Sequence, residues 1–529
     1  MHNYIEIMDT TLRDGEQTDG VSYSKFEKLQ IAKFLLDKLK VDRIEIASAR
    51  VSKGEFETVK EIFDWANSKG YRDRVEILGF VDFNASVDWI ESAGGRVINL
   101  LTKGSKKHCE YQLGKTLSEH LKDIEKTVQY AKDKNFIIHV YLEDWSGGFL
   151  YSRDYVKEML TQLVQMPIDR FMFPDTLGIL EPDEVKAGIS WALDLFPQLE
   201  IDFHGHNDYD LATANCLAAV KAGAKGVHVA VNGMGERAGN APLEAVVTAL
   251  HDKLKVQTSV NEKAITDASR LVETFSRKRV AANHPIVGQD VFTQTAGIHA
   301  DGDKKHNLYA NPILPERFGR QRYYSLGKLA GRASISNNLK ALGIELTPDK
   351  EQILLERIKE LGEKKSTVTI DDLPFLIEDL FGGIQVIYIR VKDIEIITRL
   401  RKDPIARLTL TYVEDDYTEE ATGDGGYDAF MNALRKIAEK NNMHIAELVD
   451  YEVRIPPGGK TDALVETVIT WKSPFDGTIF RTVGVDSDQI LAAVKATEKM
   501  LNRLYLIFMN KNVDDSTTPV QLSNSNFKK

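Results

Sequence analysis

Cysteine and long apolar runs are both scarce in this sequence. Only two cysteines, Cys109 and Cys216, occur among 529 residues. A framework of several disulfides is therefore excluded, which fits a reducing compartment. No run approaches about 18 consecutive apolar residues, and the first residues form no apolar signal segment. We therefore expect no membrane-spanning helix and a cytoplasmic location.

An excess of positive charge is also missing. Lysine and arginine number 68 against 79 aspartates and glutamates, which gives a net charge of −11. This balance argues against nucleic acid or an anionic membrane as the main partner. What is present, 43% hydrophobic and 28% charged residues, is typical of a soluble globular protein. The length indicates two or three domains.

The first half of the chain alternates between short β-rich runs and amphipathic stretches. The expected strands are 4–9, 42–47, 74–80, 96–101, 136–142, 169–173, 199–204 and 226–231. The expected helices include 24–40, 53–69, 86–93, 117–134, 181–196, 208–222 and 242–256. Eight such units within about 256 residues predict a (β/α)8 TIM barrel. A doubly wound open sheet is the alternative, and it is disfavoured because no Gly-x-Gly-x-x-Gly follows the first strand.

The second half has a different pattern. Residues 275–375 are irregular and rich in glycine-containing loops, which indicates a connecting region without a large core of its own. Strand-like 384–391 and 405–413 precede a helix near 425–440, and strand-like 447–455, 464–471 and 478–483 precede a helix near 487–508. This tandem pattern predicts a small α+β domain with pseudo-twofold character. The expected division is a barrel (1–275), a connecting region (276–380), a C-terminal domain (381–510) and a disordered tail (511–529).

A metal site is the first chemical feature that the sequence suggests. His204 and His206 lie two residues apart at the end of the seventh expected strand, so both imidazoles face one side. Asp14 follows the first strand, which only the eighth separates from the seventh in a closed barrel. One carboxylate and two imidazoles suit a divalent ion with open positions for substrate. Ordinary histidines and a helix-capping Asp14 are the alternative, and Lewis-acid chemistry is favoured over a redox iron site.

Longer motifs then identify a family. DTTLRDGEQ (9–17), FHGHND (203–208) and GMGERAGNAPLE (233–244) resemble the α-isopropylmalate/homocitrate/citramalate synthase family, the Claisen-condensing branch of the DRE-TIM metallolyases. Stretches around HADG (299–302), YDAF (427–430) and IPPGGKTDALVE (455–466) are similar to its citramalate synthase branch. The resemblance implies condensation of acetyl-CoA with a 2-oxo acid at one divalent metal per subunit, Mg²⁺, Mn²⁺ or Zn²⁺.

The resemblance also implies roles for individual residues. The metal ligands would be Asp14, His204 and His206, with Asn240 assisting. Arg13 would bind the acceptor and stabilise the developing oxyanion, Thr176 would bind the acceptor carboxylate, and Glu143 would be the catalytic base. The partner subunit of a homodimer with shared active sites would supply four further residues. They are His299 and Tyr309 as catalytic groups, with Asp301 and Asn307 beside them.

The acceptor's side chain would fit a pocket that the resemblance places at Leu78, Leu101 and Tyr141. Three bulky groups leave room for a methyl, and forcing in an isopropyl group costs roughly 1–3 kcal/mol or more. The second carboxylate of 2-oxoglutarate would be buried there without a cation. We therefore expect pyruvate as acceptor and (R)-citramalate as product, on the route to isoleucine. 2-Isopropylmalate synthesis, on the route to leucine, is the alternative.

The C-terminal domain is expected to dimerise and to bind isoleucine as a feedback inhibitor. Apolar residues near its glycine-rich turns would hold the aliphatic side chain, and two polar residues would hold the ligand's polar end. These candidates are Tyr427, Asp428, Leu448, Tyr451, Ile455, Thr461 and Val465. The alternative is that they form only the core and turns of a small domain. A non-catalytic sensor is disfavoured because Arg13, Asp14 and Glu143 are all intact.

Overall fold

The computed structural model describes residues 3–295, 308, 311–363, 368–382, 387–454 and 465–514, with side chains up to residue 509. Contacts divide the chain into two compact units. The first comprises Met1–Phe292 with Asn311–Gln321, and the second comprises Thr293–Ala310 with Arg322–Lys529. Among the described residues, no helix is long and apolar enough to cross a membrane.

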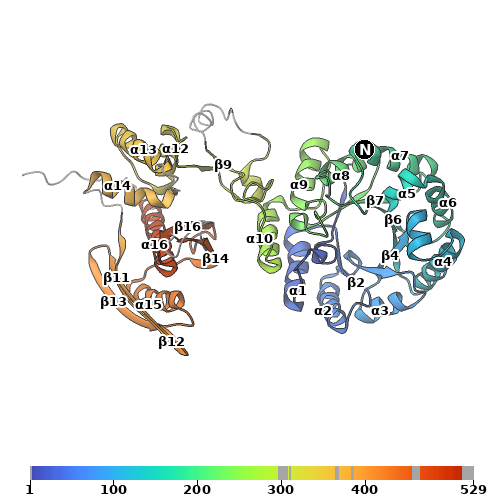
Figure 1. Ribbon diagram of the computed structural model, residues 1–529, viewed down its shortest axis with the longest axis horizontal. Helices are drawn as coiled ribbons and strands as arrows, with labels where there is room; N and C mark the ends of the chain where they lie inside the picture. Colours follow the sequence, from blue (N-terminus) through green and yellow to red (C-terminus); the bar gives the residue numbers. More distant parts are fainter. Residues whose placement is uncertain are drawn as a thin grey trace, which may run out of the picture. The chain divides into compact units, whose positions relative to one another are not determined.

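The first unit contains a closed parallel barrel, as predicted (Figure 1). Its strands pair in sequence order, and β1 closes the ring by pairing with β8. The strands are β1 (Glu6–Asp9), β2 (Arg43–Ser48), β3 (Val75–Phe80), β4 (Val97–Lys103), β5 (Ile137–Glu143), β6 (Arg170–Asp175), β7 (Ile201–Gly205) and β8 (Gly226–Val229). Every expected strand is therefore present within a few residues of its predicted bounds.

Helices surround this barrel and begin and end where the local sequence directs. Ser24 and Thr116 each form a capping box with the glutamate three residues later, and Gly70 ends its helix in the left-handed conformation. The helices are α1 (Lys25–Lys33), α2 (Lys53–Lys69), α3 (Ala85–Ala93), α4 (Leu117–Asp133), α5 (Trp145–Tyr151), α6 (Arg153–Leu163), α7 (Pro182–Leu195), α8 (Ala212–Ala222), α9 (Leu243–Ala249) and α10 (Ile265–Ser276).

Three of these helices, α5, α6 and α10, are absent from the predicted ranges. Glycine lowers helix propensity, and α5 contains both Gly147 and Gly148. A Cβ on Gly148 would lie 2.2 Å from the carbonyl oxygen of Gly104, so close packing requires glycine there. Tertiary packing thus overrides local propensity in this segment.

The barrel unit continues past the expected boundary at residue 275. Phe292 and Phe318 are buried in the barrel's apolar cluster, with their rings stacked at 6.1 Å between centroids. Arg317 pairs with Asp252 at 3.0 Å and with Glu262 at 2.7 Å. Residues 276–292 and 311–321 therefore pack as part of the barrel, while the division into three domains stays a prediction.

Within the second unit, the region predicted to be a connector without a large core contains three helices that share a small apolar cluster. The helices of this part are α12 (Arg332–Leu342), α13 (Pro348–Glu363) and α14 (Leu373–Phe381). Ile335, Leu354, Ile358 and Leu373 are fully buried in their shared cluster. The cluster is much smaller than that of the barrel, and the role of this region as a connector stays a prediction.

The C-terminal part consists of two sheet-and-helix repeats, as predicted. The first contains β11 (Ile389–Arg399), β12 (Lys402–Tyr412), β13 (Asp415–Thr422) and α15 (Gly426–Asn441), and the second contains β14 (Glu447–Arg454), β15 (Val465–Lys472), β16 (Ile479–Asp486) and α16 (Gln489–Asp514). The prediction began the first strand at 384 and missed β13, whose polar, mostly exposed sequence hides its strand pattern. Helix α16 also continues past residue 511, where the tail was expected to begin.

Candidate active site

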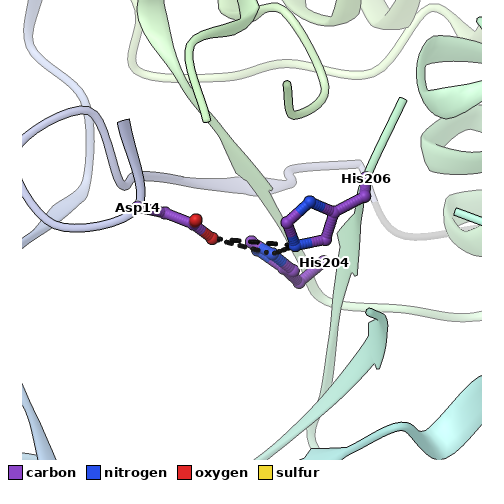
Figure 2. Close-up of side chains that lie close together, drawn as sticks. All are labelled: Asp14, His204 and His206. Atoms are coloured by element: carbon purple, nitrogen blue, oxygen red, sulfur yellow. Dashed lines mark hydrogen bonds and ion pairs between the residues drawn. The ribbon is translucent and has the colours of Figure 1, made fainter. Parts of the chain in front are cut away.

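Asp14, His204 and His206 converge at the carboxyl ends of the barrel strands, as Figure 2 shows. The Asp14 Oδ2 atom lies 3.2 Å from Nε2 of His204 and 3.9 Å from Nε2 of His206. The two Nε2 atoms are 3.3 Å apart. All three side chains are buried. Two strands on either side of β8 therefore bring together the three predicted ligands.

The geometry of this cluster fits a divalent ion. Bonds of about 2.0–2.2 Å to nitrogen and oxygen give ligand separations of about 3.0–3.4 Å for octahedral to tetrahedral angles. Two of the three observed separations lie in that range, and the third is somewhat longer. One carboxylate with two imidazoles is also a donor set that suits Mg²⁺, Mn²⁺ or Zn²⁺. These residues could therefore hold a metal.

Electrostatics keep two of the donors, Asp14 and His206, in their ligating forms. Burial, assisted by the neighbouring His204, lowers the pKa of His206 to about 4, so its imidazole is neutral near neutral pH. Burial would raise the pKa of Asp14, but the Arg13 guanidinium and the two imidazoles outweigh it and hold that pKa well below its usual range. Asp14 is therefore ionised, and metal binding requires no deprotonation of either residue.

Asn240 offers a further oxygen at the same place. Its main chain forms an isolated bridge with His206, and its amide Nδ2 donates to the Met234 carbonyl at 2.9 Å. Its Oδ1 atom is buried and has no hydrogen-bond partner among the described residues. An orphaned carbonyl oxygen beside a ligand cluster fits the metal-assisting role that was predicted for it.

Arg13 is held by Glu45, a residue of the second strand for which the sequence predicted no role. Its Nε donates to Glu45 at 2.5 Å, one terminal nitrogen lies 3.3 Å from Asp14, and the other lies 3.5 Å from the Tyr141 hydroxyl. Burial lowers the pKa of Arg13, yet Glu45 and Asp14 raise it further, so the guanidinium remains charged. Glu45 itself is fully buried and also accepts from Asn99 at 2.7 Å. The available signal was a glutamate inside an otherwise apolar strand.

The three residues predicted for the acceptor pocket lie in one apolar cluster. Leu78 and Tyr141 are buried in it, and Leu101 packs against them. Met8 and Met172, which were not predicted, complete the cluster from β1 and β6. The Tyr141 ring meets the His204 ring edge-on at 6.1 Å between centroids, so the cluster borders the ligand site. Large side chains therefore pack beside the three residues that could hold a metal.

Glu143 ends β5, and Thr176 directly follows β6 at the same rim. Glu143 is the last residue of β5, and its carboxylate pairs with Lys103 of β4. The Thr176 hydroxyl oxygen accepts a hydrogen bond from the Asp144 amide at 2.9 Å, so its own proton remains available to a ligand. Glu143 could therefore accept a proton from a substrate, and Thr176 could donate a hydrogen bond to a substrate carboxylate.

Other predicted residues cannot be placed. His299, Asp301, Asn307, Tyr309, Ile455 and Thr461 lie outside the described residues.

In the C-terminal domain the structure brings only part of the predicted inhibitor site together. The Tyr427 and Tyr451 rings lie 5.2 Å apart, and the Tyr427 hydroxyl contacts Thr497 at 2.7 Å. Asp428 accepts from the Asp424 amide at 3.1 Å. Leu448 pairs with Trp471 near the end of β15, whereas Val465 begins that strand. One chain therefore keeps Leu448 and Val465 apart.

Sequence comparisons agree with this architecture. The family model described as "HMGL-like" matches residues 4–272, "Homocitrate synthase post-HMGL domain-like" matches 286–366, and "LeuA allosteric (dimerisation) domain" matches 367–505. A putative (R)-citramalate synthase CimA from Archaeoglobus fulgidus is 36% identical over 95% of this chain and 100% of its own length.

Two further relatives match over similar lengths. A probable 2-isopropylmalate synthase from Methanopyrus kandleri is 36% identical over 95% of this chain and 99% of its own length. The (R)-citramalate synthase CimA from Methanocaldococcus jannaschii is 34% identical over 94% of this chain and 99% of its own length. The chain is therefore an acyltransferase of the family to which the citramalate synthases and 2-isopropylmalate synthases belong.

Proposed function

We propose that this enzyme is a citramalate synthase, which condenses acetyl-CoA with pyruvate to give (R)-citramalate and CoA. The observation that carries the proposal is the apolar cluster of Leu78, Leu101 and Tyr141 against the ligand site. A methyl group fits beside such bulky neighbours, whereas an isopropyl group would overpack them. Relatives named as citramalate synthases that match over nearly the whole chain support the same choice.

The acceptor would be bound by groups that the barrel holds in fixed positions. One divalent ion per subunit, at Asp14, His204 and His206, would polarise the keto oxygen when bound. Arg13, fixed by Glu45, directs a guanidinium toward the place where negative charge develops on that oxygen. Thr176 donates its free hydroxyl proton to the acceptor carboxylate. Water exclusion by the buried cluster strengthens these interactions.

Glu143 acts as the base in this proposal. Its carboxylate takes a proton from the methyl group of the acetyl thioester and leaves an enolate. The enolate carbon bonds to the keto carbon while the C=O electron pair moves onto the keto oxygen, which then takes up a proton, and water hydrolyses the thioester to release CoA. The partner subunit's His299 and the partner subunit's Tyr309 would complete the site, so activity would require a homodimer. A family model named for dimerisation supports that assembly.

Both cysteines are free and buried, which supports a cytoplasmic enzyme.

The second candidate is 2-isopropylmalate synthesis, because relatives with that name match over the same length. A panel assay separates the two. Purified enzyme is stripped of metal, restored with Mg²⁺, Mn²⁺ or Zn²⁺, and supplied with acetyl-CoA and each of pyruvate, 2-oxobutyrate, 2-oxoisovalerate and 2-oxoglutarate, while CoA thiol release is followed. We expect release with pyruvate only after metal is restored, and citramalate as the product by NMR. Preferred use of 2-oxoisovalerate would replace this proposal with the second candidate.

We also propose that the C-terminal domain binds isoleucine and inhibits the enzyme. The Tyr427 and Tyr451 rings would contact the aliphatic side chain of the ligand. Leu448 is 41% exposed, so part of its apolar surface could also contact a ligand. Because Leu448 and Val465 lie at opposite ends of their strand pair, a complete site would need both subunits of a dimer. Titration of the full chain with isoleucine and leucine tests this. Inhibition by neither amino acid would contradict it.

A further inference from the structure

Lys103 is a nearly buried lysine that the predicted site does not include. It ends β4, and only 7% of its side chain is exposed. Its ammonium pairs with the Oε2 atom of Glu143, whose side chain is 24% exposed. Among the described residues, no other carboxylate pairs with Lys103 and no other cation pairs with Glu143. A buried ammonium is costly unless it is paired, so this position ties Lys103 to Glu143.

The main chain around Lys103 is fixed on both sides. Its amide donates to Nε2 of His120 at 3.1 Å, and its carbonyl accepts from the Tyr155 hydroxyl at 2.9 Å. Burial, followed by the positive charges of Lys115 and Lys103, lowers the pKa of His120 to about 4. His120 therefore stays neutral near neutral pH and can keep accepting this hydrogen bond. The base of the lysine side chain is thus immobilised by protein groups.

Gly104 aligns this strand end with the neighbouring strand. Its amide donates to the Glu143 carbonyl at 2.6 Å, and Lys103 and Glu143 are direct partners in the β4–β5 register. A Cβ at this glycine would lie 2.4 Å from the Leu142 carbonyl oxygen. Any other residue would push β4 away from β5, so the glycine permits the close approach that sets the ion pair.

We propose that Lys103 is a positioning residue for acyl transfer, holding one carboxylate oxygen of Glu143 so that the other faces the thioester methyl group. This proposal rests on the proposed role of Glu143 as the base. Oε2 accepts from the ammonium, and no described residue hydrogen-bonds to Oε1, which remains free to take a proton. A fixed carboxylate needs less reorganisation to reach a reactive orientation than a freely rotating one.

The ion pair also suits the charge movement of the reaction. When the methyl C–H bond breaks, the proton joins Oε1 and the electron pair remains on the thioester as an enolate. Glu143 becomes neutral while negative charge appears beside it, so Lys103 always has an anion nearby. A buried cation that faces an anion before and after the step costs no additional charge separation.

The first test replaces the lysine with an uncharged side chain of similar length. We expect Lys103→Met to lower kcat by about 10²-fold, within the range for a general base, with KM for pyruvate changed by no more than about threefold. Lys103→Arg should recover part of the loss. The matched control is Lys106→Met, at an exposed lysine three residues further along the chain, which should keep wild-type kcat. An unchanged kcat in Lys103→Met would overturn the proposal.

A double-variant cycle separates this proposal from the role of Glu143, with each rate expressed per folded enzyme. If Lys103 acts through Glu143, Lys103→Met adds little further loss to Glu143→Gln. If Lys103→Met lowered kcat by the same factor in Glu143→Gln as in the wild type, the proposal would be overturned. Full activity of Glu143→Gln itself would instead contradict the proposed base.

Trideuterated acetyl-CoA gives a readout that a merely structural role would not move. The kinetic isotope effect on kcat should increase in Lys103→Met, because proton removal then limits the rate more strongly. Circular dichroism spectra and melting curves of both variants show whether folding has changed. An isotope effect equal to that of the wild type in a folded, slow variant would contradict positioning.

Discussion

The centre of the barrel and the inhibitor site proposed in the C-terminal domain are built differently. In the barrel, residues from distant positions meet within one chain, because closed parallel strands direct their carboxyl ends to one rim. In the C-terminal domain, Tyr427 and Tyr451 meet, but Leu448 and Val465 stay at opposite ends of a strand pair. A closed barrel can present a complete ligand set alone, whereas two small open sheets present parts that a second subunit would complete.

The largest expected effect follows from removing one of the three donors in the barrel. Asp14→Ala or His204→Ala should reduce CoA release to background, since each removes one of three converging donors. Bound metal, measured by mass spectrometry of the protein after desalting, should fall in parallel. Asp19→Ala, at an exposed aspartate in the same segment, should retain both. Wild-type turnover by a metal-free Asp14→Ala enzyme would contradict the account.

A smaller loss should follow from disturbing the guanidinium. Arg13→Lys removes the planar fork that meets Glu45, Asp14 and Tyr141 together, and an ammonium reaches fewer of them. We expect kcat to fall by about 10²–10³-fold, as for other donors to a developing oxyanion. Glu45→Gln should fall less, because its amide can still accept from Arg13. A larger loss in Glu45→Gln than in Arg13→Lys would show that Glu45 does more than position the arginine.

These residues also show how far the sequence could be read. His204, His206 and Asp14 were predictable because strand order alone brings them to one rim. Glu45 and Lys103 were not, because their roles depend on which neighbour each contacts across the β1–β2 and β4–β5 ends. Helix α5 was missed because its glycines serve close packing.

In the C-terminal domain, the alternating pattern predicted most strands of both repeats. It failed at β13, where polar residues occupy both faces of an exposed strand.

A change in the proposed acceptor pocket should alter the preference between pyruvate and 2-oxoisovalerate without affecting the metal site. Leu101→Ala adds space beside Leu78 and Tyr141, so 2-oxoisovalerate should gain relative to pyruvate. We expect the ratio of kcat/KM values to shift by about 10-fold or more, the usual value of one or two methylene groups. Metal content should remain unchanged. A ratio equal to that of the wild type would indicate that Leu101 does not contact the acceptor.

On the C-terminal side, Tyr427→Ala should affect regulation. It removes one ring of the Tyr427–Tyr451 pair, so the isoleucine concentration for half-inhibition should rise by about 10-fold, as for loss of a well-packed aromatic contact. Leucine should be titrated beside it. An unchanged isoleucine response would place the inhibitor site elsewhere.

The smallest effect concerns stability in mild acid. His120 has a folded-state pKa of about 4 against an ordinary value of 6.5, because burial disfavours its charged form. The unfolded chain then binds the proton more readily, so this contribution to stability is complete above pH 6.5 and is lost as the pH falls toward 4. His120→Gln should flatten the dependence of the melting temperature on pH by an amount equivalent to about 1–3 kcal/mol. Parallel curves for both proteins would contradict the assignment.

The most direct test of the central claim is the ratio of kcat/KM for pyruvate to kcat/KM for 2-oxoisovalerate, measured on one metal-loaded sample by CoA release. The crowded cluster of Leu78, Leu101 and Tyr141 predicts a ratio of at least about 10², because the larger acceptor adds two carbons beside them. A ratio near one, or one that favours 2-oxoisovalerate, would contradict the assignment as a citramalate synthase.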